Sequence, residues 1–247
     1  MKSQTMGIKA PIKYLKANVR TVMETSLGKK KFRIVNALTP SPVSPPAGAV
    51  DILRAGLIPL LILKLKTELD EIQELILGTL SNCLRVEASE ALATDAITIL
   101  KEKLTHPSAV IRSKAAQVIL EISTHPEGKS TVCEEVIPIL VSLLEDTDPE
   151  VQASAAGALM FTTIKPKGRC SALRAGAIPR LLKLVAEDNS KARLSAIKTL
   201  TMLAEVAEGR RELRQHTDTF EQCLRDPREA VKRAAEIAIR VIRWKPA

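Results

Sequence analysis

The stretch 128–163, GKSTVCEEVIPILVSLLEDTDPEVQASAAGALMFTT, contains two apolar segments separated by a polar break. The first segment is centred on 137–140, and the second includes the pair Ala155 and Ala156. The break at 146–149 ends in Pro149, which is tolerated in the first turn of a helix but not in its interior. This pattern predicts two consecutive helices, preceded by a turn at Gly128.

The same pattern recurs along the chain at steps of 38 to 41 residues. The repeated isoleucines are Ile58, Ile97, Ile137 and Ile178, and the repeated alanines are Ala115, Ala155, Ala196 and Ala234. A period near 40 residues with helical spacing inside it is typical of armadillo and HEAT repeats. The sequence therefore predicts an all-α, armadillo- or HEAT-like right-handed solenoid of about five repeats.

Each repeat is expected to contain a short and a long helix. The expected pairs are 56–66 with 71–85, 95–104 with 111–123, 136–144 with 151–163, 176–185 with 192–206, and 217–224 with 228–242. The last repeat carries charges such as Lys232 and Arg233 among its apolar positions. A polar final repeat lets a solenoid end in water.

Residues 1–47 differ from the solenoid, which we place at 48–247. Residues 1–50 hold nine Lys or Arg and one acid, whereas the remainder holds 28 basic and 27 acidic residues. We expect this basic, Pro-containing leader to be largely disordered and dispensable for folding. The exception is 11–25, where Ile12, Leu15, Val19 and Val22 lie at helical spacing; this helix could cover the apolar first repeat.

Composition argues against several other functions. The four cysteines lie 37 to 53 residues apart, which favours free thiols in a reducing compartment. No apolar run reaches the length of a membrane span. Aromatic residues are only 2% of the chain and the solenoid's charge is balanced, so nucleic-acid binding is not expected. No cofactor, no metal and no small-molecule substrate are predicted.

Two patterns resemble catalytic or ligand sites but do not meet their requirements. Gly128-Lys129-Ser130 lacks the glycine that a P-loop needs five residues earlier, where Ser123 stands. His106, His125 and His216 are expected in separate exposed turns and lack the spacing of metal ligands. No catalytic residues are assigned, and the chain is expected not to be an enzyme.

A binding face is expected on the long helices, which line the concave side of such solenoids and bind peptides or partner helices. Counting from the repeated alanine places two residues of each helix on the exposed side, one turn apart. These residues are Gly78 and Asn82, Gln117 and Glu121, Gly157 and Phe161, Lys198 and Met202, and Glu236 and Arg240. Gly157 is expected to expose backbone beside Phe161, although Phe161 could instead pack under the adjacent repeat.

Several strings are more specific than an armadillo consensus: IRSKAA at 111–116, VIPILV at 136–141, AAGALMF at 155–161, AIKTLTMLAE at 196–205 and IRVIRWKP at 239–246. Through them, residues 48–246 resemble the radial spoke head 14 family of armadillo-repeat proteins. The chain departs from that family at its leader, where the family has further repeats.

The resemblance implies a structural component of the radial spoke, in the axoneme of motile cilia or flagella, whose partners are other radial spoke proteins. The expected location is the cytoplasm, within the ciliary cytoskeleton. An alternative is a soluble armadillo adaptor that carries cargo peptides, with the basic cluster at 29–33 acting in nuclear import. The importin-type binding face, with Trp and Asn repeated at the two exposed positions, is not matched, because only Asn82 fits it.

Overall fold

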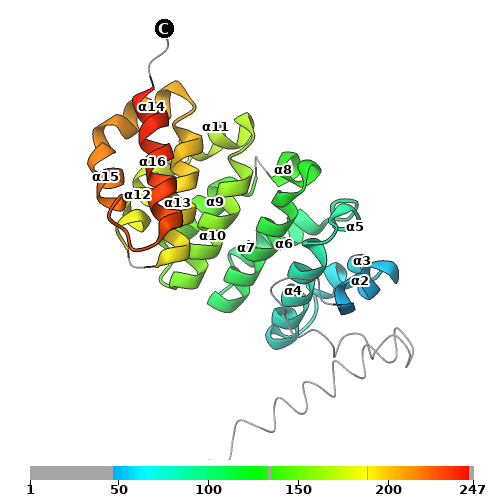
Figure 1. The fold of residues 1–247 in the computed structure, drawn as a ribbon. Coiled ribbons are helices and arrows are strands. Elements are labelled where there is room, and N and C mark those ends of the chain that lie inside the picture. Colours follow the sequence, from blue (N-terminus) through cyan, green and yellow to red (C-terminus); the bar gives the residue numbers. More distant parts are fainter. Residues whose placement is uncertain (1–46, 133–134, 188, 245–247) are drawn as a thin grey trace, which may run out of the picture.

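The computed structural model describes residues 47–132, 135–187 and 189–244, and within these ranges it contains helices and turns but no strand. The expectations for residues 1–46 lie outside the described residues and remain predictions. The helices form five consecutive repeats of three helices each (Figure 1). The all-α solenoid predicted from the 40-residue period is therefore confirmed.

Each repeat has the same order of helices. The first helices are α2 (Ala47–Arg54), α5 (Ser89–Leu92), α8 (Pro126–Val132), α11 (Pro166–Arg174) and α14 (Ala207–Leu213). The second are α3 (Ile58–Lys64), α6 (Ala96–Leu104), α9 (Ile137–Ser142) continued by η1 (Leu143–Glu145), α12 (Ala177–Ala186), and α15 (Thr217–Cys223) preceded by η2 (Arg214–His216). The third and longest are α4 (Asp70–Leu84), α7 (Ala109–Thr124), α10 (Pro149–Thr162), α13 (Ser190–Leu203) and α16 (Glu229–Arg243).

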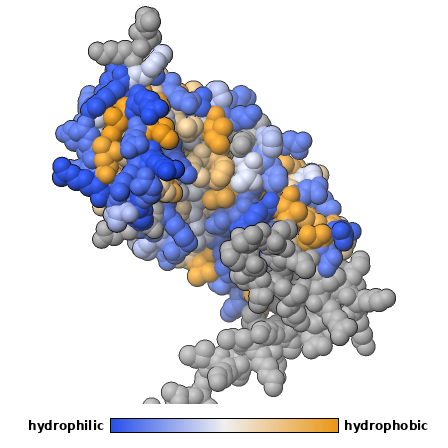
Figure 2. Space-filling view, viewed as in Figure 1, coloured by the Kyte–Doolittle hydropathy of each residue, from blue (hydrophilic) through white to orange (hydrophobic). Residues whose placement is uncertain are grey.

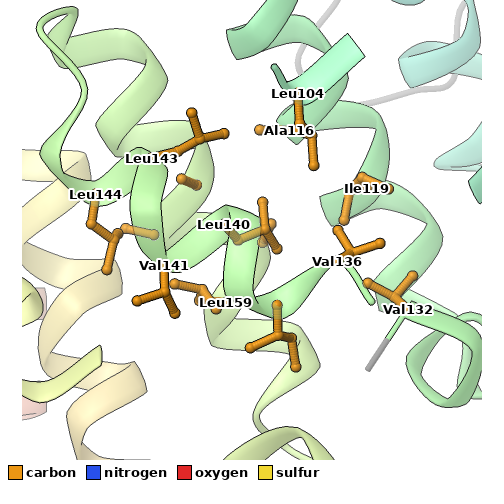
Figure 3. Packing of buried hydrophobic residues seen from close by; sticks show 14 of the residues in the cluster. Leu104, Ala116, Ile119, Val132, Val136, Leu140, Val141, Leu143, Leu144 and Leu159 are labelled. Atoms are coloured by element: carbon orange, nitrogen blue, oxygen red, sulfur yellow. The ribbon is translucent and has the colours of Figure 1, made fainter. Parts of the chain in front are cut away.

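The five long helices form a row in which α4 packs on α7, α7 on α10, α10 on α13 and α13 on α16. The alanine pairs Ala115–Ala116 and Ala155–Ala156 are fully buried. Their small side chains allow neighbouring long helices to approach closely. In the central repeats, Leu140 of α9 lies between the α7 residues Ala116 and Ile119 and Leu159 of α10, so that one core continues between repeats (Figure 3).

The short first helix of each repeat is not among the expected helices. Gly128 lies within α8 rather than in a turn, and Gly209 lies within α14. A Cβ atom at Gly128 would lie 2.1 Å from the carbonyl oxygen of Ile122, and one at Gly209 would lie 2.4 Å from that of Leu203. These glycines therefore let each short helix cross directly over the end of the preceding long helix.

Glycine has a different role before the second helix. Gly56 and Gly176 have φ values of 63° and 71°, which are left-handed conformations that residues with a Cβ adopt at a cost. The expected sharp turn at Gly176 is thus confirmed. Pro59 and Pro138 follow in the first turn of α3 and α9, where a missing N–H group leaves no helical hydrogen bond unmade.

One position near the start of α4, α7, α10 and α13 ties each of these long helices to the preceding loop. Gln73 donates to the carbonyl of Glu68, Gln152 to Asp146, and the equivalent Arg112 and Arg193 to His106 and Glu187. In two repeats this position is arginine, which also reaches the next repeat. Arg112 binds both carboxylate oxygens of Asp146 at 2.8 and 2.9 Å, and Arg193 binds Asp226.

We call the pairs Arg112–Asp146 and Arg193–Asp226 the Arg–Asp clamps. In both, hydrogen bonds from arginine lower the pKa of the aspartate. Burial alone would raise the pKa of Asp146, but hydrogen bonds from Arg112 and from the backbone N–H of Asp148 lower it below its ordinary value. A hydrogen bond from Arg228 is the main cause that holds the pKa of Asp226 well below its ordinary value. Both carboxylates are therefore ionised at neutral pH and pair with arginine.

The last repeat carries charges at positions that are buried in all other repeats. Glu236 occupies the position that is Leu77, Ala116, Ala156 and Ile197 in the first four repeats. Arg243 likewise occupies the position of Leu84, Ser123, Thr163 and Ala204. Those eight equivalents are at most 1% exposed, whereas Glu236 and Arg243 are exposed. Hydrophilic side chains accordingly dominate this end of the molecule in Figure 2. The expected polar final repeat is confirmed.

Candidate protein-binding face

The long helices present two equivalent positions, one turn apart, across the row. From α4 to α13 the first position is occupied by Gly78, Gln117, Gly157 and Lys198, and the second by Asn82, Glu121, Phe161 and Met202. We call this surface the ladder face. Lys198 is exposed, and Gly78, Asn82, Gln117, Phe161 and Met202 are half-buried. The residues placed there by sequence thus lie in matching positions on adjacent helices.

Two members of the ladder face are not accessible. Glu121 is only 4% exposed; its carboxylate accepts hydrogen bonds from Arg85 at 3.1 Å and Gln117 at 2.9 Å. Gly157 is buried, because the side chain of Leu120 on α7 packs against it. A Cβ atom added at Gly157 would lie only 2.7 Å from Cδ1 of Leu120. The expectation that Gly157 exposes its backbone was therefore wrong: the long side chain of a neighbour fills the space that glycine leaves.

In α16 the register differs by one residue from the one that the alanine spacing suggested. The buried positions Ile111, Val151 and Ala192 correspond to Val231, which is 1% exposed. Counting from Val231 places Ile237 and Val241, rather than Glu236 and Arg240, in line with Lys198 and Met202. Glu236 instead lines a shallow groove of about 450 Å³ at the end of the solenoid, with Leu224 and Arg243.

An apolar stripe crosses the last three repeats of the ladder face. Phe161, Met202 and Val241 occupy the same position on α10, α13 and α16, and all three are half-buried. Ile237, one turn before Val241, is 51% exposed. The first two repeats have Asn82 and Glu121 at this position. The ladder face is therefore polar at one end and apolar at the other, and sequence reasoning missed the contribution of Ile237 and Val241.

The stripe has the composition expected of a contact surface for another protein. Phenylalanine and methionine provide large, adaptable apolar area, and aromatic residues are enriched where interfaces are most strongly bound. Lys198, which is exposed one turn before Met202 on α13, adds one positive charge. This arrangement can bury an apolar side chain of a partner while the charge at its edge restricts orientation.

The histidines and cysteines do not form a chemical centre among the described residues. His106 lies 3.5 Å from Asp70, and Nε2 of His125 lies 2.7 Å from the carbonyl oxygen of Leu84. Both rings are half-buried rather than exposed, contrary to expectation, because they connect adjacent repeats. Burial raises the pKa of the Cys83 thiol to about 12, which leaves it unreactive at neutral pH.

The described ranges contain neither a cluster of metal-ligand side chains nor a membrane-spanning helix. No group of three or more His, Cys, Asp or Glu side chains there could hold a metal ion. None of the helices described is both long and apolar enough to cross a membrane. Gly128 of the incomplete P-loop pattern lies within α8, after another helix, whereas a P-loop follows a strand.

Known structures with the same architecture include designed armadillo repeat proteins. An engineered protein aligns with a TM-score of 0.79 at 21% identity, covering 97% of this chain and 61% of its own. A designed armadillo repeat protein in complex with the peptide (KR)4 aligns with a TM-score of 0.76 at 18% identity, covering 95% of this chain and 99% of its own. At these identities the likeness establishes the fold alone.

The fold and the ladder face together define an armadillo-like α-solenoid, a repeat scaffold suited to binding other proteins. Such solenoids are typically non-enzymatic binding or scaffold proteins. A family model, described as the adaptin N terminal region, matches residues 60–243, which is most of the chain. The chain therefore belongs to the Adaptin N terminal region family.

Proposed function

We propose that this chain is a non-enzymatic structural component of the radial spoke in the axoneme of motile cilia or flagella. In this role the solenoid binds other radial spoke proteins through its ladder face and holds them in fixed relative positions. The resemblance to the radial spoke head 14 family supports this assignment. The first of the five resembling strings, 111–116, lies in α7, and the last, 239–246, begins in α16.

The observation that carries the binding mode is the apolar stripe of Phe161, Met202 and Val241. A groove that selects an extended basic peptide needs acidic or amide groups repeated along the ladder. Here Glu121 is already paired with Arg85, and Lys198 is a positive charge. The stripe fits the apolar face of a partner helix better, because one apolar residue recurs on each of three neighbouring helices.

The Phe161→Ala variant tests this proposal by pull-down from axonemal extract. Truncating an aromatic residue at the centre of an interface typically costs about 2 kcal/mol or more, roughly thirtyfold in affinity. Truncating a core phenylalanine instead destabilises the fold by about 3–5 kcal/mol. Unchanged melting with loss of the captured spoke proteins supports the proposal. A large fall in melting temperature means that Phe161 serves the core only.

A matched control is Leu63→Ala, because Leu63 is 60% exposed on α3, outside the long-helix row. This variant should melt normally and retain spoke proteins. Equal loss of binding in both variants contradicts the assignment to the ladder face. Capture of cargo peptides or import factors, with no spoke protein, favours the alternative function as a soluble armadillo adaptor.

A further inference from the structure

The outward faces of the first and last long helices, α4 and α16, differ in the side chains that they carry. At the end formed by α16, Glu236 and Arg243 place charges where another repeat would pack, so that this face is compatible with water. The opposite end, formed by α4, lacks such charges at its corresponding positions. Ile72 and Thr79 stand there, and both are half-buried. Their equivalents in the next four repeats are fully buried or nearly so: Ile111, Val151, Ala192 and Val231, and Val118, Ala158, Thr199 and Ala238.

Leu75 is the most exposed apolar residue of this open face, at 47%. Its equivalents in the following repeats include Lys114 and Ser154, and both contact the preceding long helix. Lys114 donates to the carbonyl of Glu74 at 3.1 Å, and the hydroxyl of Ser154 lies 3.1 Å from that of Ser113. Leu75 therefore marks the place where a further helix would lie against α4. In the next three repeats this position is polar, but here it is leucine.

One acidic residue of α4, Glu71, lies beside the open face. The 15 residues of α4 include Asp70, Glu71 and Glu74 but no lysine or arginine. Asp70 and Glu74 face the second repeat, where they approach His106 and Lys114. Glu71 is exposed, one helical turn before Leu75. A segment that covers this face should therefore combine an apolar stripe with positive charge.

One segment of this chain has that combination. Residues 11–25 have apolar residues at helical spacing, with Lys13, Lys16 and Arg20 between them. Residues 26–46 separate this segment from α2; these 21 residues can span up to about 70 Å. The 15-residue α4 is about 22 Å long, so the connection can reach any part of it.

We propose that residues 11–25 pack as an amphipathic helix across Ile72, Leu75 and Thr79 of the same chain and close the open end of the solenoid. The apolar stripe of the segment covers these three side chains, and its basic residues lie beside Glu71. The solenoid thereby carries its own cap at the first repeat, whereas charged residues of the last repeat seal the other end.

Zero-length carbodiimide cross-linking of the full chain tests the cap, because it joins a lysine to a carboxylate only when the two are in contact. The expected product is an intramolecular bond between Lys13 or Lys16 and Glu71, identified by peptide mass spectrometry. Leu75→Arg removes apolar area and adds a repelling charge, so the yield should fall about tenfold, as expected when burial of one leucine is lost. Leu63→Arg is the matched control, since Leu63 is an exposed leucine of the same repeat, and it should retain the bond.

Amide hydrogen exchange provides a second readout on the same proteins. Residues 11–25 should be protected in the natural chain and in Leu63→Arg, and should lose protection in Leu75→Arg, while α7 and α10 stay protected in all three. Three outcomes overturn the proposal. They are unprotected residues 11–25 in the natural chain, equal cross-linking in both variants, and cross-links only between molecules, which would mean that a second copy covers the face.

Discussion

The same substitution, glycine to alanine, should have opposite effects at two positions of this solenoid. At Gly78, within α4, an added Cβ atom meets no other atom within 4 Å. Alanine is favoured over glycine in a helix by about 0.8–1.0 kcal/mol. At Gly128, within α8, the added Cβ would lie 2.1 Å from the carbonyl oxygen of Ile122 and 2.7 Å from its Cγ2.

Because the oxygen belongs to the backbone of α7, it cannot rotate away, and either α7 or α8 must shift. Overpacking of this kind typically costs about 1–3 kcal/mol. We therefore expect Gly78→Ala to increase the free energy of unfolding by up to about 1 kcal/mol and Gly128→Ala to decrease it by about 1–3 kcal/mol. For a chain of this size the two melting temperatures should differ by roughly 5–15 °C.

Thermal unfolding followed by circular dichroism at 222 nm measures this difference. Gly209→Ala provides an independent repetition of the effect, since its Cβ would lie 2.4 Å from the carbonyl oxygen of Leu203. The reasoning is refuted if Gly128→Ala melts at or above the temperature of the natural chain. It is equally refuted if Gly78→Ala destabilises the chain as much as Gly128→Ala.

Three further predictions concern acid stability, thiol reactivity and unfolding. The pKa values of Asp146 and Asp226 are lowered on folding, so their pairing with arginine stabilises the chain above about pH 4, and this stabilisation is lost as pH falls further. In an acid titration, Asp146→Asn should therefore lose less stability than the natural chain. The exposed Cys170 should react with a maleimide in the native chain, whereas Cys83 and Cys223, both buried, should react only after unfolding, as peptide mapping can show. Unfolding in denaturant should be gradual or occur in several steps along the array, and a single sharp transition by both circular dichroism and hydrogen exchange would count against this expectation.

The long helices could be predicted from sequence because their apolar residues repeat with helical spacing inside a constant period. The expected range 151–163 overlaps α10, and 111–123 lies within α7. The short first helices could not be found in this way. α5 has only four residues, and α8 and α11 are largely polar, so that none shows an apolar stripe. Pro126 and Pro166, each at a helix start, were the available signals.

The binding face was predicted less completely, for two physical reasons. The alanine pair of the last repeat, Ala234–Ala235, suggested a register that the packing of Val231 shifts by one residue. Asp226, which matches Asp146 in accepting an arginine from the preceding repeat, would have given the correct alignment. The burial of Gly157 depends on a contact with Leu120 from another repeat, and sequence spacing contains no information on such contacts.

Fractionation of motile cilia tests the central claim most directly. Axonemes are separated from membrane and soluble matrix, radial spokes are then extracted with salt, and the chain is followed by a specific antibody. We predict that the chain remains with the axoneme, leaves it in the same extract as known spoke proteins and co-sediments with them on a density gradient. Recovery in the soluble matrix or the nucleus, or retention on axonemes after the spokes have been removed, would contradict a role as a radial spoke scaffold.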